Sequence, residues 1–268
     1  MRVLYVGDIM GEFGRWVVEK ELPSIKSKYR PDIVLAQAEN VTHGRGLKID
    51  HYKQLKSIGI DGFMSGNHIL AVPEAATLVA DKNHPVTRPA NYPEGAPGQK
   101  YKIIPTKDGD VALITLLGQI VGKDADEPTI NPLQVVDELL GLDDIKRAPI
   151  KIVNFHGDYS SEKVVIGQYL DGEVSAVVGD HWHVPSADAR VLPGGTAHIS
   201  DVGMVGARNS SLGVKTDVIV ERWRRQKPSR NELEEVGEYQ FCGLIVEIDP
   251  STSKAVSVEQ ILTYGTRT

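Results

Sequence analysis

The first 68 residues alternate short apolar runs with stretches of helical spacing, and this alternation restricts the chain to a small group of folds. Pro23 should kink or split the first helix, because proline disrupts a helix interior. The order strand, helix, strand, helix, strand predicts an α/β fold, and each strand stops at polar residues. The expected elements lie at 2–8, 12–29, 32–40, 50–58 and 59–68.

The rest of the chain adds further strand-like runs, at 102–105, 111–118, 150–158, 173–183 and 195–204. Two apolar runs near the carboxyl end flank the turn residues 250–253, which predicts a hairpin. With no internal repeat and no linker, residues 1–268 are expected to form a single domain. The polar stretch Arg224–Glu238 is interpreted as an excursion from it, and the basic run RWRRQK as a solvated helix end rather than a nucleic-acid site.

The charge balance excludes an overall positive surface. The formal net charge is −6, so nucleic acid or an anionic membrane is not drawn to the chain as a whole, and any affinity for phosphate must be local. Asp8 interrupts the amino-terminal apolar run, and no stretch approaches the roughly 20 apolar residues that span a bilayer. A cytoplasmic protein without a membrane partner is expected. The single cysteine, Cys242, is predicted to be a buried side chain rather than a nucleophile.

Five of the predicted strands end on side chains with oxygen or nitrogen donor atoms. These are Asp8, Glu39 with Asn40, Asn67 with His68, His156, and His181 with His183. Each alone is explained by a helix cap, a turn or a satisfied core histidine. Structural roles do not require such residues at successive strand ends, whereas a metal centre needs donors that converge from several elements. The group therefore predicts a metal centre at the strand ends.

The donor types narrow the choice of metal. Two carboxylates, two amide oxygens and three imidazoles suit divalent manganese, iron or zinc, and exclude a thiolate zinc finger. Seven donors are too many for one tetrahedral site and match two ions that share a carboxylate. Two such ions (+4) with two carboxylates (−2) keep about two positive charges, which favours an anionic substrate and a phosphorane-like transition state. A Rossmann dinucleotide site is disfavoured, because GDIMGEFG lacks the Gly-x-Gly-x-x-Gly spacing.

Several motifs then occur in one order along the chain: VGDIMGEFGR, AQAENVTHGRGL, SGNH, RPANYP, NFHGD, SSEK, GDHWHVPSADARVLPGGTAHISDVGM and GLIVEID. In these motifs the chain resembles the YmdB-like branch of the calcineurin-like metallophosphoesterases, over nearly its whole length. The resemblance implies a four-layer α/β/β/α sandwich with metals at the strand ends. It also implies hydrolysis of phosphodiesters, notably 2′,3′-cyclic nucleotides.

The same resemblance assigns ligands to two divalent ions, iron, manganese or zinc. One ion would be held by Asp8, Glu39, Asn40 and His183, and the other by Glu39, Asn67, His156 and His181, with Glu39 shared. His68 takes the family's general-acid position. The expected reaction is attack on phosphorus by a hydroxide that bridges the ions, while His68 protonates the departing ribose oxygen.

Departures from the family pattern surround the expected ligands without replacing them. Gly157–Tyr159 follow His156 where the family commonly has other residues, and Trp182 stands in place of the usual threonine. A shift in substrate preference is therefore expected, although the sequence does not indicate toward which substrate. If residues 181–183 are extended, alternation turns both histidines to one side and Trp182 away, where it either packs beneath the site or walls the substrate cleft.

Other polar residues are weaker candidates for the site. Arg88, His43 and Trp182 are assigned to substrate binding, with a structural salt bridge as the alternative for Arg88 and a solvent-facing position as the alternative for His43. His198 and Asp201 are expected to orient the ligating histidines through hydrogen bonds.

Three functions remain open at this point. The first is a dinuclear phosphodiesterase acting on cyclic nucleotides or related small phosphodiesters. The second is a phosphomonoesterase or nuclease that uses the same centre. The third is a weakly catalytic, metal-stabilised regulatory protein linked to RNA. The identity of the metals, the physiological substrate, RNA ends as a partner and a homo-oligomeric state are not decided by the sequence.

Overall fold

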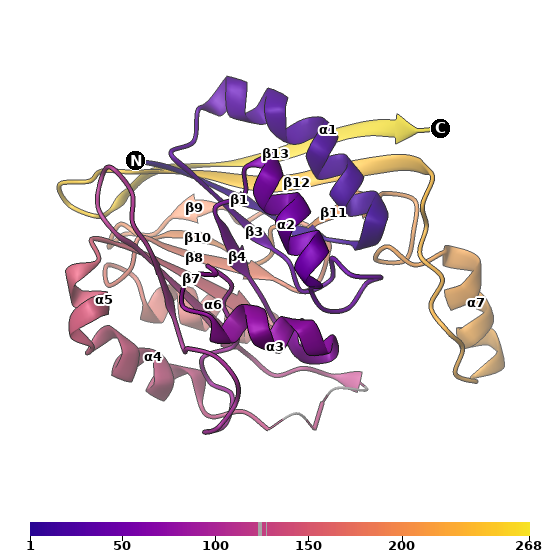
Figure 1. Ribbon diagram of the computed structural model, residues 1–268, viewed down its shortest axis with the longest axis horizontal. Helices are drawn as coiled ribbons and strands as arrows, with labels where there is room; N and C mark the ends of the chain where they lie inside the picture. Colours follow the sequence, from indigo (N-terminus) through magenta and orange to yellow (C-terminus); the bar gives the residue numbers. More distant parts are fainter. Residues whose placement is uncertain (123–124, 127) are drawn as a thin grey trace.

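Two β-sheets pack face to face, and helices cover their outer faces, in the computed structural model (Figure 1). The structure describes residues 1–122, 125–126 and 128–268. Apolar side chains fill three successive layers: under the helices of the first sheet, between the two sheets, and under the helices of the second sheet. This is the four-layer α/β/β/α sandwich implied by the motifs, so the fold prediction is confirmed. The single-domain interpretation stays a prediction.

The larger sheet has seven strands, in the order β2-β11-β12-β1-β3-β4, with β13 also paired to β12. β1, β3 and β4 run parallel, as the helices that connect them require. β12 and β13 form the antiparallel hairpin expected near the carboxyl end. The bounds are β1 Arg2–Val6, β2 Asp8–Ile9, β3 Ile33–Gln37, β4 Gly62–Met64, β11 Met204–Ala207, β12 Gly237–Ile248 and β13 Ala255–Arg267.

The smaller sheet has six strands, in the order β5-β6-β7-β8-β10-β9. The neighbours β6, β7, β8 and β10 are parallel, so their carboxyl ends meet at one edge of the sheet. At that edge β7 ends on His156 and β8 ends on Asp180. The bounds are β5 Lys102–Ile104, β6 Val111–Leu117, β7 Ile150–His156, β8 Ala176–Asp180, β9 Arg190–Val191 and β10 Ala197–Ile199.

Strand β1 contributes side chains to two hydrophobic cores, one on each face of the larger sheet. Successive side chains of a strand point to opposite faces of the sheet. Val3 and Tyr5 lie in the core between the sheets, while Leu4 and Val6 lie in the core under the helices. Because both faces are buried, residues 3–6 are apolar throughout instead of alternating with polar residues.

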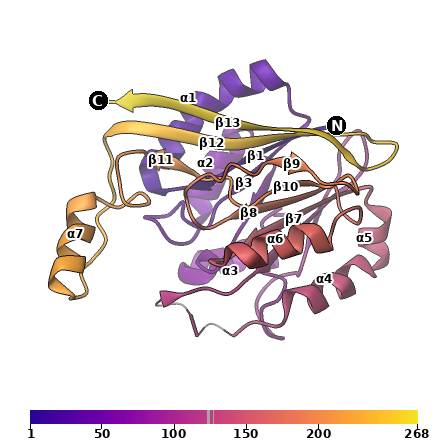
Figure 2. The ribbon, with the colours of Figure 1, turned by 180° about the vertical axis from the view of Figure 1, so that it is seen from behind.

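Helices α1, α2 and α3 cover the larger sheet, and α4, α5 and α6 cover the smaller one (Figures 1 and 2). Helix α7 stands apart from the sandwich at one side and buries none of its residues. Within the described ranges, no helix is long and apolar enough to cross a membrane. The bounds are α1 Gly11–Tyr29, α2 Ile49–Ile58, the short 3-10 helix η1 Ile69–Ala71, α3 Pro73–Ala80, α4 Pro132–Leu140, α5 Asp143–Arg147, α6 Ser160–Tyr169 and α7 Thr216–Arg225.

The structure corrects one predicted strand. The sequence predicts a single strand at 195–204, but the chain leaves the smaller sheet after β10 and enters the larger sheet at β11. Residues 200–203 make this crossing. The two short strands look like one in the sequence because only residues 200–203 separate them. Pro23 lies inside α1, which is not split there.

Cys242 lies in β12 with an exposure of 1%, and burial raises the pKa of its thiol to about 12. Because the thiolate is the reactive form, we expect the folded protein to resist alkylation by iodoacetamide at pH 8. The guanidinium-unfolded chain should be alkylated once, which intact-mass spectrometry would detect. Rapid alkylation of the folded protein would contradict the buried position of this thiol.

Candidate metal centre

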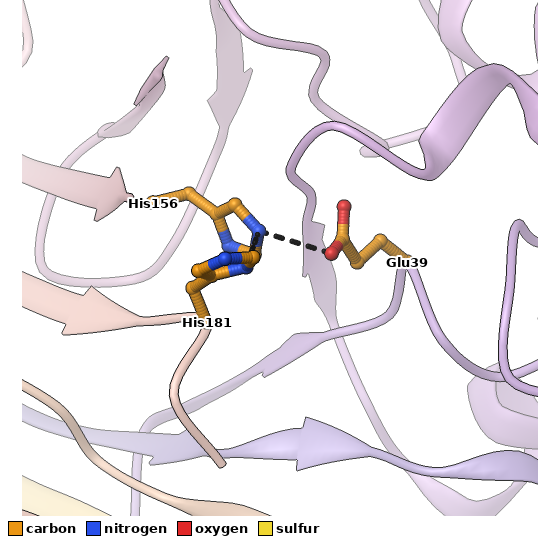
Figure 3. A group of neighbouring side chains, drawn as sticks. All are labelled: Glu39, His156 and His181. Carbon is orange, nitrogen blue, oxygen red and sulfur yellow. Dashed lines mark hydrogen bonds and ion pairs between the residues drawn. The ribbon is translucent and has the colours of Figure 1, made fainter. Parts of the chain in front are cut away.

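Side chains from the ends of several strands meet where the two sheets abut. Glu39 lies just after β3, His156 ends β7 and His181 follows β8, and Figure 3 shows their side chains turned toward one another. The Nε2 atom of His156 lies 3.0 Å from Oε1 of Glu39, 2.9 Å from Nδ1 of His181 and 3.1 Å from Oδ1 of Asn67. Glu39, Asn67, His156 and His181 are called the Glu39 cluster below. Glu39 and His156 are fully buried.

Gly66 allows this cluster to close. A Cβ atom at this position would lie 2.4 Å from Nε2 of His156 and 2.5 Å from Oε2 of Glu39, closer than side chains approach one another. The missing side chain lets the next residues approach Glu39, and the backbone N–H of His68 donates to Oε2 of Glu39 at 2.7 Å. The SGNH segment therefore brings both Asn67 and His68 to the site.

A second group, called the Asp8 cluster, contains Asp8, Asn40 and His183. Nδ2 of Asn40 lies 3.3 Å from Oδ1 of Asp8 and 3.2 Å from Nε2 of His183. A half turn of the Asn40 amide would present its oxygen there instead. The backbone N–H of His181 donates to Oδ2 of Asp8 at 3.3 Å, which joins the two clusters. The structure thus brings together all seven residues predicted as ligands, whose coordination of a metal stays a prediction.

The segment after β8 turns at each histidine instead of continuing as a strand. His181 has φ 99° and His183 has φ 63°, both in the left-handed region that favours glycine. The prediction that an extended backbone orients these residues is therefore wrong. The turns send His181 to the Glu39 cluster and His183 to the Asp8 cluster. Such conformations cost about 1–3 kcal/mol for a residue with a side chain, and they concentrate at functional sites.

His183 presents an uncharged nitrogen to the Asp8 cluster. Its Nδ1–H donates to the carbonyl oxygen of Leu212 at 3.2 Å, so the lone pair of the neutral ring lies on Nε2. Burial lowers the pKa of His183 to about 4, and the neighbouring His181 contributes to the same shift. The ring is therefore neutral at physiological pH, which is the form that binds a metal.

Asp180, the last residue of β8, is a site residue that sequence reasoning missed. Its Oδ1 accepts from Nδ1 of His156 at 2.6 Å, which leaves Nε2 of that ring to face the Glu39 cluster. Its Oδ2 accepts hydrogen bonds from Tyr5, Gln37 and Asn154. A signal was present in the sequence, because Asp180 ends a strand just before His181, as the other site residues end theirs.

Asp158 orients His181 in a similar way. Its Oδ2 lies 3.2 Å from Nε2 of His181 and also accepts from the backbone N–H of Val121 at 2.7 Å. The departure from the family pattern at Gly157–Tyr159 therefore supplies a direct partner for a ligand candidate. Its effect on substrate preference stays a prediction.

His198 and Asp201 do not orient the histidine rings, so their predicted role is wrong. Nε2 of His198 contacts the carbonyl oxygen of Lys163 at 3.0 Å. Asp201 accepts from Nζ of Lys163 at 2.8 Å and from the backbone N–H of Trp182 at 2.9 Å. Asp201 therefore fixes the backbone between the two site histidines rather than either ring.

Replacing Asp180 by asparagine is expected to weaken metal binding about 10- to 100-fold, because the amide cannot accept from every donor that now surrounds the carboxylate. Chelator competition would measure the metal affinity. Asp188→Asn is the matched control, because Asp188 accepts from Ser186 and Ser200 without touching either cluster in the described structure. Equal weakening by both substitutions would contradict an orienting role for Asp180.

The two clusters concentrate buried carboxylates around imidazole rings. Burial raises the pKa of Asp8, and the nearby Asp180 and Glu39 raise it further. Burial opposes the charge of Glu39, but the charge of a protonated His156 outweighs it and lowers the pKa of Glu39. Burial likewise opposes the charge of His156, yet Glu39 and Asp180 raise its pKa above the usual value. The electrostatic field of these buried carboxylates thus favours a positive charge between them, carried by a proton or a metal ion.

A divalent ion fits the Glu39 cluster. In the described part of the chain, Oε1 of Glu39 is buried without a hydrogen-bond partner, although Nε2 of His156 lies 3.0 Å away. Lone pairs that face one another in this way repel unless a cation lies between them. Donor atoms bound about 2.1 Å from one ion at right angles lie about 3 Å apart, as these atoms do. Glu39, His156 and His181 can therefore hold one ion together.

His68 lies beside both clusters with its side chain 21% exposed. Its Nδ1 is 2.9 Å from Oδ1 of Asn40 and 3.7 Å from Oε1 of Glu39. The ring is therefore held at the edge of the buried centre while remaining accessible from solvent. This position suits a residue that exchanges a proton with a bound substrate.

The other predicted contacts with substrate are less central. Arg88 is buried and donates to the backbone oxygens of Gly98 and Pro89, so these bonds tie it to the protein. His43 is exposed in the loop after Asn40 and has a left-handed φ of 51°. Substrate binding by either residue stays a prediction.

Trp182 packs against the protein between the two site histidines. Its Nε1–H donates to the carbonyl oxygen of Asp158 at 2.9 Å, and Nζ of Lys163 lies 4.0 Å from its ring centre. These contacts favour the first of the two alternatives left by the sequence, packing beneath the site. A contact between Trp182 and substrate stays a prediction.

Comparisons with known proteins agree with the motifs and the geometry. The family described as YmdB-like protein matches residues 4–261. The chain is 38% identical over 262 residues to the 2′,3′-cyclic-nucleotide 2′-phosphodiesterase of Bacillus subtilis (strain 168), across 98% of this chain and 97% of that protein.

Two solved structures share the whole architecture. A novel phosphatase from Mycoplasma pneumoniae superposes with a TM-score of 0.91 and 32% identity, over 99% of this chain and 94% of that one. A hypothetical protein from Thermus thermophilus superposes with a TM-score of 0.89 and 32% identity, over 98% and 99% of the two chains. The resemblance read from the motifs is confirmed, and the chain belongs to the YmdB-like family.

Proposed function

We propose that this protein is a phosphodiesterase that uses two divalent ions to hydrolyse 2′,3′-cyclic nucleotides or related small phosphodiesters. The observation that carries the proposal is the adjacency of the Asp8 and Glu39 clusters beside the partly exposed His68. The relative from Bacillus subtilis is named for this class of substrate, which supports the choice. Ions held between so few carboxylates retain positive charge, and that charge favours a phosphate ester.

Seven residues would hold the ions. Asp8, Asn40 and His183 would bind one, Asn67, His156 and His181 the other, and Glu39 would bind both. When bound, divalent ions supply Lewis acidity, which attracts phosphate oxygens and lowers the pKa of water. Iron, manganese and zinc all accept nitrogen and oxygen donors of these kinds.

His68 would deliver the proton that the leaving group needs. Once the Asn40 amide is turned to offer its oxygen to an ion, its Nδ2–H lies beside Nδ1 of His68 and donates to it, which fixes the ring plane and leaves the transferable proton on Nε2. The backbone hydrogen bond from His68 to Glu39 holds the residue in place. Water adds to phosphorus and gives up a proton to solvent, the bond from phosphorus to one ribose oxygen breaks, and that oxygen takes the proton of His68, which yields a nucleoside monophosphate.

The test is hydrolysis of 2′,3′-cyclic AMP by protein reconstituted with manganese, iron or zinc, followed by chromatography of the nucleotides. We expect turnover after reconstitution, loss of turnover on chelation, and about two ions per chain by elemental analysis. Adenosine monophosphate and a short linear RNA, assayed in parallel, separate the two enzymatic alternatives. Faster turnover of either would contradict the proposed substrate class, and full activity with a single ion would contradict the dinuclear centre.

A further inference from the structure

A hollow of about 670 Å³ opens beside the proposed metal centre, between the sandwich and the segment that carries α7. Met10, two residues beyond Asp8, and His43, three residues beyond Asn40, line its inner side. Arg45 continues this side, and Arg222, Arg230 and Asn231 form the opposite side. Two of the loops that build the Asp8 cluster therefore also build the hollow.

The hollow is positively charged although the chain as a whole is acidic. Arg222 and Arg230 supply this charge, and among the described lining residues of the hollow none carries a carboxylate. A volume of this size falls within the range of small-molecule sites, about 300–1,000 Å³. The guanidinium fork of arginine matches phosphate oxygens, so the lining suits a phosphate group.

Arg222 is held in place by neutral atoms. Its Nε–H donates to Oγ of Ser229 at 3.0 Å, and its Nη2 donates to the carbonyl oxygen of Ser229 at 2.9 Å and to Oδ1 of Asn231 at 2.6 Å. These bonds fix the side chain without neutralising its charge. On the same helix, Arg224 and Arg225 instead pair with Glu221, at 3.0 Å and 2.8 Å.

We propose that this hollow binds the internal phosphodiester of a substrate longer than a mononucleotide, a short oligoribonucleotide whose 2′,3′-cyclic phosphate lies at the metal centre. The inference rests on the proposed function and extends it. A cyclic mononucleotide carries a single phosphate, which the metal centre takes, whereas the next phosphate along an RNA strand needs a neighbouring cationic site. The arginines of the hollow provide that site. Of the basic run RWRRQK, only Arg222 is thereby given a role, and the other residues keep the interpretation of a solvated helix end.

Binding is tested apart from hydrolysis with metal-free protein and a fluorescein-labelled pentaribonucleotide, by fluorescence anisotropy. Arg222→Ala and Arg230→Ala should each weaken binding about tenfold, and each should make the negative slope of log affinity against log salt shallower by about 0.7. Arg230 is exposed, so its replacement tests the site without risk to folding. Arg224→Ala, on the same helix but paired with Glu221, is the matched control and should change neither quantity.

Kinetics then test the substrate. The ratio of kcat/KM for a trinucleotide with a 2′,3′-cyclic end to kcat/KM for 2′,3′-cyclic AMP should fall about tenfold in the Arg222 and Arg230 variants, and should stay constant in Arg224→Ala. An unchanged ratio and unchanged anisotropy in both variants would overturn the proposal. Displacement of the labelled RNA by an equally charged polyglutamate peptide as readily as by unlabelled RNA would also overturn it, in favour of an acidic peptide.

Failure of the proposed function gives a different result. If wild-type protein hydrolyses neither cyclic substrate in any metal form, the proposed function fails, while the anisotropy of the metal-free variants still decides whether the hollow binds RNA.

Discussion

A His68→Ala variant should hydrolyse 2′,3′-cyclic AMP about 10² to 10⁴ times more slowly than the wild-type protein, because it lacks the group that protonates the departing ribose oxygen. Hydrolysis of an activated aryl diester such as bis(p-nitrophenyl) phosphate should slow much less, because nitrophenolate is a leaving group that needs no proton. The contrast between the two leaving groups is the informative measurement, and kcat for both substrates should be determined at saturating metal.

Two controls separate this role from a structural one. Metal content should be unchanged, because the substitution keeps the backbone N–H that donates to Glu39 at 2.7 Å and removes only a ring that lies 3.7 Å from that carboxylate. His84→Ala is the matched control: it also removes an imidazole, but from a ring that pairs with Asp81 just after α3. Equal slowing of both substrates by His68→Ala, or loss of metal from that variant, would contradict the general-acid role.

Glu39→Gln should abolish both metal binding and activity. The substitution keeps the size of the side chain but removes the charge of the residue proposed to bind both ions. Because the nearby His156 holds the pKa of Glu39 below its usual range, the carboxylate is charged at neutral pH, and its replacement removes a full negative charge from the centre. We expect no stoichiometrically bound ion and at least a 10²-fold loss of kcat on 2′,3′-cyclic AMP.

The thermal stability of the same variant provides a readout that does not depend on activity. Ions that bind only the folded state stabilise it by about 2.7 kcal/mol at a concentration 100 times Kd. Added metal should therefore raise the Tm of the wild-type protein and leave the Tm of Glu39→Gln unchanged. Glu94→Gln, at an exposed carboxylate, is the control and should retain the wild-type response. A normal metal-induced rise in the Tm of Glu39→Gln would contradict a shared ligand at this position.

Some contacts of the site follow from strand register rather than from a local pattern. His156 and Asp180 are direct neighbours across the parallel pair β7 and β8, which is why the carboxylate reaches Nδ1 of the ring. The sequences of the two segments, taken separately, do not predict that His156 lies opposite Asp180. The same holds for Asp158 and His181, which meet because two loops leave the same edge of the sheet.

The basic run after residue 221 illustrates the limit of charge patterns. Neighbouring arginines on one helix have different partners: Arg224 and Arg225 pair with Glu221, while Arg222 is held by Ser229 and Asn231 across a turn of chain. A sequence shows the number of charges in such a run, but the direction of each side chain decides which charge is neutralised.

The sequence by itself determined the layered α/β fold and most of the residues at its centre. Apolar runs specify buried strands, and polar side chains at the end of each run can gather at one edge only if those strands are packed together. The tertiary structure alone decided how those residues are oriented. The left-handed turns at His181 and His183, the hydrogen bond from His156 to Asp180 and the charged hollow at Arg222 depend on contacts between segments far apart in the chain. Such contacts arise only when the sheets and loops have packed, because the energy of a buried polar group is set by the partner it meets.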